Sequence, residues 1–153
     1  MNNAKQRLIF ALDVDNLADA RGWVDRLQGQ VGVFKIGKQL FTRCGPEVVR
    51  LVQERGGEVF LDLKYHDIPN TVAMAGLEAL RLGVRMFNVH ALGGFEMMAK
   101  LVAAIDEVCP RGNPDRPILL AVTILTSSTE ETLRGVGIDR PVPVMVPKLA
   151  LLA

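Results

Sequence analysis

The sequence lacks the features that mark secreted and membrane-spanning proteins. It has two cysteines, Cys44 and Cys109, which are far apart and show no CxxC or Cys/His spacing. They are expected to be free thiols in a reducing cytoplasm rather than a disulfide or a zinc site. No apolar run approaches the roughly eighteen residues of a membrane span, and the apolar stretch after the basic N-terminus is too short for a signal sequence. We therefore predict a cytoplasmic protein with no membrane partner.

Charge of one sign is not in excess. The formal net charge is +1, and no segment carries five or six like charges in a row. The sequence thus gives no electrostatic basis for a nucleic-acid partner, and local groups must hold any anionic ligand. No GxGxxG follows the first apolar run, which makes a dinucleotide site unexpected. The composition, 49% hydrophobic and 23% charged, is typical of a globular protein, and the length predicts a single domain over residues 1–153.

Five short apolar runs, rich in Val, Ile, Leu and Phe, alternate with amphipathic stretches. The runs predict buried strands. The first interval carries a helical apolar stripe, with Asn16 as its expected N-cap. Strand followed by helix, repeated along the chain, predicts an α/β protein with parallel strands. The predicted strands are residues 8–14, 33–37, 59–65, 86–91 and 118–126.

Proline and glycine mark the ends of the later predicted helices. The second helix should follow Pro46 and end at Gly56, and the third should run from near Pro69 toward Gly83. The fourth should end before Pro110.

Two architectures fit this alternation: a doubly wound open sheet and a (β/α)8 barrel. An open sheet gathers its ligand groups at one switch point, whereas here polar groups end almost every predicted strand. Because a barrel brings all these ends around one centre, we predict the TIM barrel, with about the first five β/α units present in this chain. The polar strand-end residues are Asp13, Lys35, Asp62, Lys64, Asn88, His90 and Thr126.

The length falls short of a whole barrel, which usually takes roughly 250 residues. An apolar helix is predicted to begin after Pro147, and it stops without a capping signal. The chain is therefore expected to be the N-terminal part of a barrel, truncated at the C-terminus.

Charge is concentrated in segment 61–71, LDLKYHDIPNT, where an apolar strand gives way to a helix. Asp62 and Lys64 are two apart on a strand and share a face, and Asp67 follows in the turn. Lys35 lies among apolar neighbours, so it should have a carboxylate partner. Such a network can be a structural ion pair. It also suits decarboxylation, in which a carbanion forms and is then protonated by a fixed lysine.

Segment 61–71 closely resembles the signature of the orotidine 5′-phosphate decarboxylase family, whose members convert orotidine monophosphate to uridine monophosphate in pyrimidine synthesis. The resemblance continues, in the same order, along essentially the whole chain. It implies a carboxy-lyase with a TIM-barrel fold and no metal, flavin or nucleotide cofactor. The other matching segments are Ala11-Leu12-Asp13, Lys35-Ile36-Gly37-Lys38, Phe87-Asn88-Val89-His90-Ala91 with Gly93-Gly94, and Val122-Thr123-Ile124-Leu125-Thr126-Ser127.

The resemblance implies four catalytic residues. Lys64 would be the acid that protonates C6 of the pyrimidine, and Asp62 would lie beside the departing carboxylate. Lys35 would link this network to the ribose. Asp67 would complete the charge array from the neighbouring subunit, which implies a homodimer with shared active sites.

The resemblance also implies further contacts with the substrate, orotidine 5′-monophosphate. Asp13 would bind a ribose hydroxyl, as part of a substrate-binding set that includes Lys35 and Asp62. Thr126 would meet the pyrimidine edge. Ile68 and Thr71 would reach across the dimer interface.

Two alternatives remain at this point. Related barrel enzymes acting on sugar phosphates share an Asp-x-Lys-x-x-Asp segment but use an acidic metal ligand on the second strand, where this chain has Lys35. A non-catalytic role follows from the predicted truncation, because barrels of this type grip phosphate after their seventh and eighth strands. The chain by itself is therefore expected to bind nucleotide weakly and to be inactive. His66 and His90 are expected to be hydrogen-bonded structural histidines.

Overall fold

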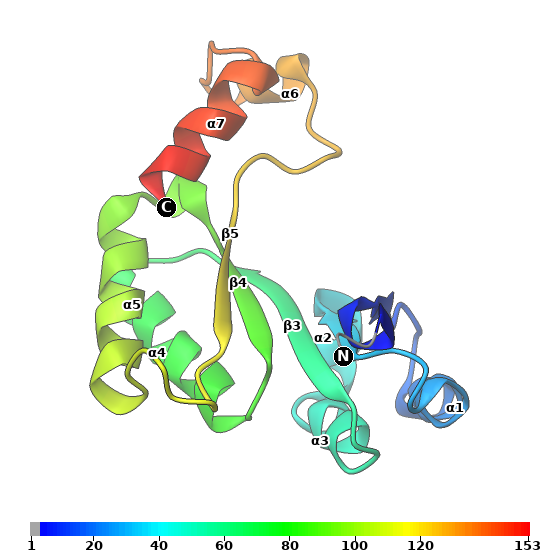
Figure 1. Ribbon diagram of the computed structural model, residues 1–153. Coiled ribbons are helices and arrows are strands. Elements are labelled where there is room, and N and C mark those ends of the chain that lie inside the picture. The colour runs from blue at the N-terminus through cyan, green and yellow to red at the C-terminus, as the bar shows by residue number, and fades with distance from the viewer. Residues whose placement is uncertain (1–3) are drawn as a thin grey trace.

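A computed structural model describes residues 4–153 and shows a five-stranded parallel sheet flanked by helices (Figure 1). The strand order is β1-β2-β3-β4-β5, so each strand pairs with the next one in the sequence. A doubly wound sheet would reverse its order at a switch point, and this sheet does not. The order is that of consecutive strands in a β/α barrel. The strands are β1 (Ile9–Ala11), β2 (Val33–Gly37), β3 (Glu58–Tyr65), β4 (Met86–His90) and β5 (Ile118–Val122).

The central strands match their predicted bounds within one residue, whereas the two edge strands are shorter than predicted. β1 lacks the predicted residues beyond Ala11, and β5 ends at Val122 rather than at Thr126. Each edge strand has one pairing neighbour in the sheet. β5 ends opposite His90, where β4 itself ends, because no ladder remains for it to continue.

The predicted helices are present, and two further helices were not predicted. Asn16 caps α1 as expected, since its Oδ1 accepts a hydrogen bond of 2.9 Å from the amide of Asp19. The connections of the five β/α units contain α1 (Leu17–Leu27), α2 (Lys38–Cys44), α3 (Glu47–Gln53), α4 (Pro69–Arg81), η2 (Ala91–Gly93) and α5 (Phe95–Val108). The remaining helical elements are η1 (Ala4–Arg7), α6 (Glu130–Gly135) and α7 (Val142–Leu152).

The unpredicted helices are short. α2 follows β2 with no intervening loop, and its one fully buried side chain is Leu40. α6 begins with a capping box formed by Thr129 and Thr132. The expectation that the last helix begins after Pro147 is wrong: α7 starts at Val142 and contains that proline. Its buried residues, Met145 and Leu149, lie on both sides of Pro147, so packing holds the helix together despite the lost hydrogen bond.

The two faces of the sheet differ in composition. On the outer face, Phe34, Ile36, Leu61 and Phe87 are buried against the helices and form the core. α4 and α5 pack side by side along one flank of the sheet (Figure 1). A Cβ atom at Gly76 of α4 would overlap Leu101 of α5, so glycine permits their close approach.

The inner face changes character along the strands. Near their amino ends it carries apolar side chains such as Ile9, Met86 and Ile118, and near their carboxyl ends it carries Lys35 and Asp62. Lys35 and Asp62 thus lie near each other toward the carboxyl end of this face. Within residues 4–153, no helix has the length and apolar character needed to cross a membrane.

Candidate active site

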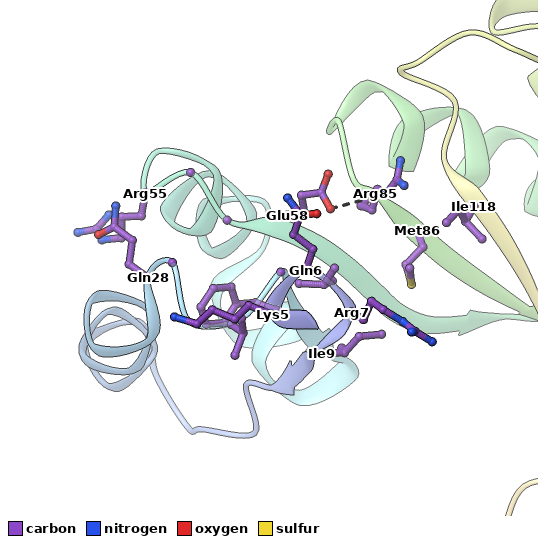
Figure 2. Close-up of a pocket in the computed structure, with 17 residues that line it drawn as sticks. Lys5, Gln6, Arg7, Ile9, Gln28, Arg55, Glu58, Arg85, Met86 and Ile118 are labelled. Atoms are coloured by element: carbon purple, nitrogen blue, oxygen red, sulfur yellow. Dashed lines mark ion pairs between the residues drawn. The ribbon is translucent and has the colours of Figure 1, made fainter. Parts of the chain in front are cut away.

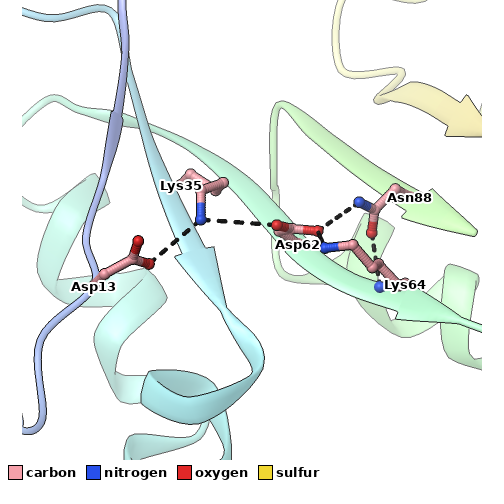
Figure 3. Close-up of polar contacts among 5 residues, drawn as sticks. All are labelled: Asp13, Lys35, Asp62, Lys64 and Asn88. Atoms are coloured by element: carbon pink, nitrogen blue, oxygen red, sulfur yellow. Dashed lines mark hydrogen bonds and ion pairs between the residues drawn. The ribbon is translucent and has the colours of Figure 1, made fainter. Parts of the chain in front are cut away.

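Asp62 is the centre of a charged network at the carboxyl ends of the strands (Figure 3). Its Oδ1 accepts hydrogen bonds of 2.6 Å from Nζ of Lys64 and 2.6 Å from Nδ2 of Asn88. Its Oδ2 lies 3.7 Å from Nζ of Lys35. Only 13% of the Asp62 side chain is exposed, so these partners replace most of its contact with water.

The network continues to the first strand. Nζ of Lys35 also lies 3.4 Å from Oδ1 of Asp13, which follows β1. The prediction that Lys35 has a carboxylate partner is therefore confirmed, and it has two. The prediction that Asp62 and Lys64 point together is confirmed as well. Charges alternate in sign from Asp13 through Lys35 and Asp62 to Lys64, across three neighbouring strands.

The network keeps Asp62 ionised. Burial alone would raise the pKa of this carboxyl, but the hydrogen bonds from Lys64 and Asn88, with the charges of Lys64 and Lys35, lower the pKa below its ordinary value of 3.8. The ionised carboxylate lies between the ammonium groups of Lys35 and Lys64. The site therefore presents an ammonium group that can act as a proton donor.

The backbone at Lys64 is unusual. Its φ is +52°, in the left-handed region that residues with a side chain rarely adopt. The pairing of β3 with β4 is regular through Leu61 and then shifts before Tyr65. The amide of Lys64 donates a 2.7 Å hydrogen bond to Oδ1 of Asn88 instead of following the strand ladder. Asn88 was predicted as a polar residue at a strand end, without a role in the site.

Asp67 lies outside the network of its own chain. It is exposed, and its Oδ1 accepts a 2.6 Å hydrogen bond from the amide of Ile68. Within one chain, the second carboxylate of the network is that of Asp13 rather than that of Asp67. Ile68 is 66% exposed, and Thr71, in the first turn of α4, is also exposed. Thr126 is exposed in the segment after β5.

His66 and His90 lie beside this network, with ring centroids 5.5 Å apart. Burial lowers the pKa of His90, and the charges of His66, Lys38 and Lys64 lower it further. Its Nδ1 is buried and has no hydrogen-bond partner among the described residues. The expectation of a hydrogen-bonded histidine is therefore wrong for this atom. In residues 4–153, no three His, Cys, Asp or Glu side chains gather in a group that could hold a metal ion.

A hollow with a volume of about 720 Å³ lies at the opposite end of the inner face (Figure 2). Ile9, Met86 and Ile118 line it, together with the ion pair of Glu58 and Arg85, in which Oε2 and Nε are 3.6 Å apart. This hollow does not contain the network around Asp62.

A sequential parallel sheet with convergent charges at its carboxyl ends defines a β/α-barrel protein of the kind that places its chemistry at that end. The family model described as "Orotidine 5'-phosphate decarboxylase / HUMPS family" matches residues 6–152. The chain belongs to this family.

Named relatives agree with this assignment. The chain is 67% identical over 150 residues to the orotidine 5′-phosphate decarboxylase of Syntrophotalea carbinolica, covering 98% of this chain and 62% of the relative. It is 61% identical over 152 residues to that of Geobacter sulfurreducens, covering 99% and 63% respectively. The chain thus spans less than two thirds of the length of these relatives.

A solved structure supports the fold. The crystal structure of orotidine 5′-phosphate decarboxylase from Lactobacillus acidophilus matches with a TM-score of 0.83 and 36% identity, over 94% of this chain and 64% of that one. The prediction of a TIM-barrel fold, present here in part, is confirmed by this match and by the strand order.

Proposed function

We propose that this protein decarboxylates orotidine 5′-monophosphate to uridine 5′-monophosphate in pyrimidine synthesis. The observation that carries the proposal is the Asp62 carboxylate, which two lysine ammonium groups approach and which stays ionised. Family membership and the names of the relatives support the same substrate.

The proposed reaction needs one proton and releases one molecule of carbon dioxide. The bond between C6 and the carboxylate of the pyrimidine breaks, CO₂ leaves, and the bonding electron pair remains on C6. The ammonium of Lys64 then donates its proton to C6 and later regains one from water. Asp62 lies beside the departing carboxylate, so loss of CO₂ relieves a repulsion, and the ammonium stabilises the carbanion that forms.

The surrounding residues bind the rest of the nucleotide. Lys35 connects the network to the ribose, and Asp13 binds a ribose hydroxyl. The 3.4 Å contact between these two side chains supports their joint role. Thr126 contacts the pyrimidine edge from the segment after β5.

The working unit in this proposal is a homodimer with shared active sites. Asp67 completes the charge array of the partner subunit, and Ile68 and Thr71 reach across the interface. The exposure of all three supports this role, because nothing among residues 4–153 covers them. The proposal places the enzyme in the cytoplasm and includes no metal, flavin or nucleotide cofactor, no nucleic-acid partner and no membrane partner.

The family description also covers sugar-phosphate enzymes. The residue on the second strand distinguishes these enzymes from the nucleotide decarboxylases. Those relatives have an acidic metal ligand there, and this chain has Lys35, whose charge repels a divalent cation. Turnover of orotidine monophosphate that persists in excess chelator would support the nucleotide decarboxylase.

The first test compares Lys64→Ala with wild type at native length, following the loss of absorbance of orotidine monophosphate. Removal of the general acid should lower kcat by roughly 10²–10⁴-fold. Lys100→Ala is the matched control, because Lys100 is an exposed lysine of α5 outside the network; its activity should stay within twofold of wild type. Equal activity of Lys64→Ala and wild type would contradict the assigned acid.

A further inference from the structure

Asn88 is the one buried polar side chain of the core among residues 4–153, with 4% exposure. A buried amide without hydrogen-bond partners is destabilising, so its contacts need an explanation. Asn88 lies in β4, two residues before His90, on the inner face of the sheet. Both ends of its amide are used in the network around Asp62 (Figure 3).

One end of the amide replaces a missing ladder bond. β3 and β4 pair regularly at Leu61 and Phe87, then lose register before Tyr65. In this gap the amide of Lys64, with φ +52°, donates to Oδ1 of Asn88 at 2.7 Å. A buried backbone donor would otherwise be unpaired in such an irregularity. The side chain thus stabilises a backbone conformation that lysine disfavours.

The other end fixes the carboxylate. Nδ2 of Asn88 donates to Oδ1 of Asp62 at 2.6 Å, and the same oxygen accepts from Nζ of Lys64 at 2.6 Å. The orientation of the amide is determined by its partners: an ionised carboxylate only accepts, and a backbone N–H only donates. A reversed amide would place Nδ2 beside the N–H of Lys64, donor against donor, and Oδ1 beside the carboxylate of Asp62, acceptor against acceptor. Asparagine therefore matches this site in both shape and polarity.

We propose that Asn88 is a positioning residue for the decarboxylation, an inference that rests on the proposed function. It holds the main chain of Lys64 and the carboxylate of Asp62 with one rigid amide, so the ammonium and the carboxylate keep their relative geometry. Without it, the Lys64 backbone can leave the left-handed region and the Asp62 carboxylate can rotate. Asn88 acts through these two residues and needs no contact with the substrate.

Two variants test the hydrogen bonds at the two ends of the Asn88 amide separately. Asn88→Ala removes both hydrogen bonds. Asn88→Asp keeps the shape and the acceptor for the Lys64 amide but loses the donor to Asp62 and adds a repelling carboxylate. Gln53→Met is the matched control, because the partly buried Gln53 amide donates to two backbone carbonyls that are not part of the network, those of Leu82 and Gly83.

The first readouts are made by NMR on the unliganded protein at native length, so they need no turnover. Hydrogen exchange of the Lys64 amide should accelerate at least tenfold in Asn88→Ala, relative to the amide of Leu61 in the same strand. It should stay slow in Asn88→Asp and in Gln53→Met. The pKa of Asp62 should rise in both Asn88 variants and remain unchanged in the control. Unchanged Lys64 exchange and Asp62 pKa in Asn88→Ala would overturn the proposal.

Kinetics then tests the link to the reaction. A loss of geometry at the reacting groups should lower kcat by roughly tenfold to hundredfold in both Asn88 variants, with KM within threefold of wild type. A kcat equal to wild type, despite accelerated exchange at Lys64, would refute a positioning role. If wild type itself does not decarboxylate orotidine monophosphate, the proposed function fails, while the exchange and pKa measurements still decide whether Asn88 holds the pair.

Discussion

The two ends of the inner sheet face provide a comparison within one molecule. At the amino end, a hollow of about 720 Å³ is lined by apolar side chains, by the Glu58–Arg85 ion pair and by further basic side chains, Lys5, Arg7 and Arg55. At the carboxyl end, Asp62 gathers three hydrogen-bonding or charged partners from β2, β3 and β4. Glu58 and Asp62 share a face of β3 and are about 13 Å apart along it. The same strand thus carries a carboxylate at each end, in opposite surroundings.

The difference favours the carboxyl end as the site of the proposed reaction, because charges converge there on a buried carboxylate, whereas the amino end offers a hollow with solvated charges. Glu58 and Arg85 are 55% and 43% exposed, so water can solvate each of them separately. Asp62 is 13% exposed, and its neighbours hold its pKa below the ordinary value. A large hollow can result from strand geometry alone, whereas several charges on one buried carboxylate have a desolvation cost that a functional site explains.

Among the variants that compare the two ends of the sheet face, Asp62→Asn should have the largest effect. It removes the charge that holds Lys35 and Lys64, and the repulsion that favours loss of CO₂. We expect kcat/KM for orotidine monophosphate to fall roughly 10²-fold or more. Glu58→Gln is the matched variant on the same strand, and its kcat/KM should remain within twofold of wild type. Comparable losses in the two variants would remove the distinction between the ends.

Much of this arrangement could be predicted from the sequence. The alternation of apolar runs and stripes predicted parallel strands, because burial on both faces of a parallel strand leaves a continuous apolar signal. The polar residues at the strand ends then predicted a barrel, and with it the sequential strand order. The two-residue spacing of Asp62 and Lys64 predicted their contact, and the apolar neighbours of Lys35 predicted its ion pair. These predictions depend on local periodicity and on the cost of an unpaired charge.

Other features depend on contacts that no local pattern encodes. The ends of β1 and β5 are set by the neighbouring strand, so the apolar runs there overestimated their length. The irregular pairing near Lys64 arises because an amide from β4 replaces a ladder bond, and only the register of two strands brings Asn88 to that position. The unpartnered Nδ1 of His90 likewise results from tertiary packing.

The acid dependence of stability should differ between wild type and Asp62→Asn. The pKa of Asp62 is lowered in the folded state, so its ionised form stabilises the fold above the unfolded-state pKa, and this contribution is lost as pH falls below about 3.8. Urea unfolding between about pH 5 and pH 2 should give a steeper fall in unfolding free energy for wild type than for Asp62→Asn. Parallel curves would show that Asp62 is not stabilised by its partners.

A smaller effect is expected at the exposed edge of the network. Asp13 is 71% exposed and 3.4 Å from Lys35, so its ion pair contributes at most about 1 kcal/mol. If Asp13 binds a ribose hydroxyl, Asp13→Asn should raise KM about three- to tenfold, which is typical of the loss of one hydrogen bond. kcat should stay within twofold of wild type. Asp15→Asn, two residues further in the same loop, is the control. A kcat loss as large as that of Asp62→Asn would place Asp13 among the reacting groups.

The smallest effect should come from Arg85→Ala at the amino end. Arg85 and Glu58 are both substantially exposed and 3.6 Å apart, so salt and water screen their attraction. A double-mutant cycle with Glu58→Gln, followed by urea unfolding, should give a coupling energy below about 0.5 kcal/mol, and kcat/KM should stay within twofold of wild type. A large coupling would mean that the amino end also holds its charges out of water. In that case the contrast in solvation between Glu58 and Asp62 would no longer support placing the proposed active site at the carboxyl end.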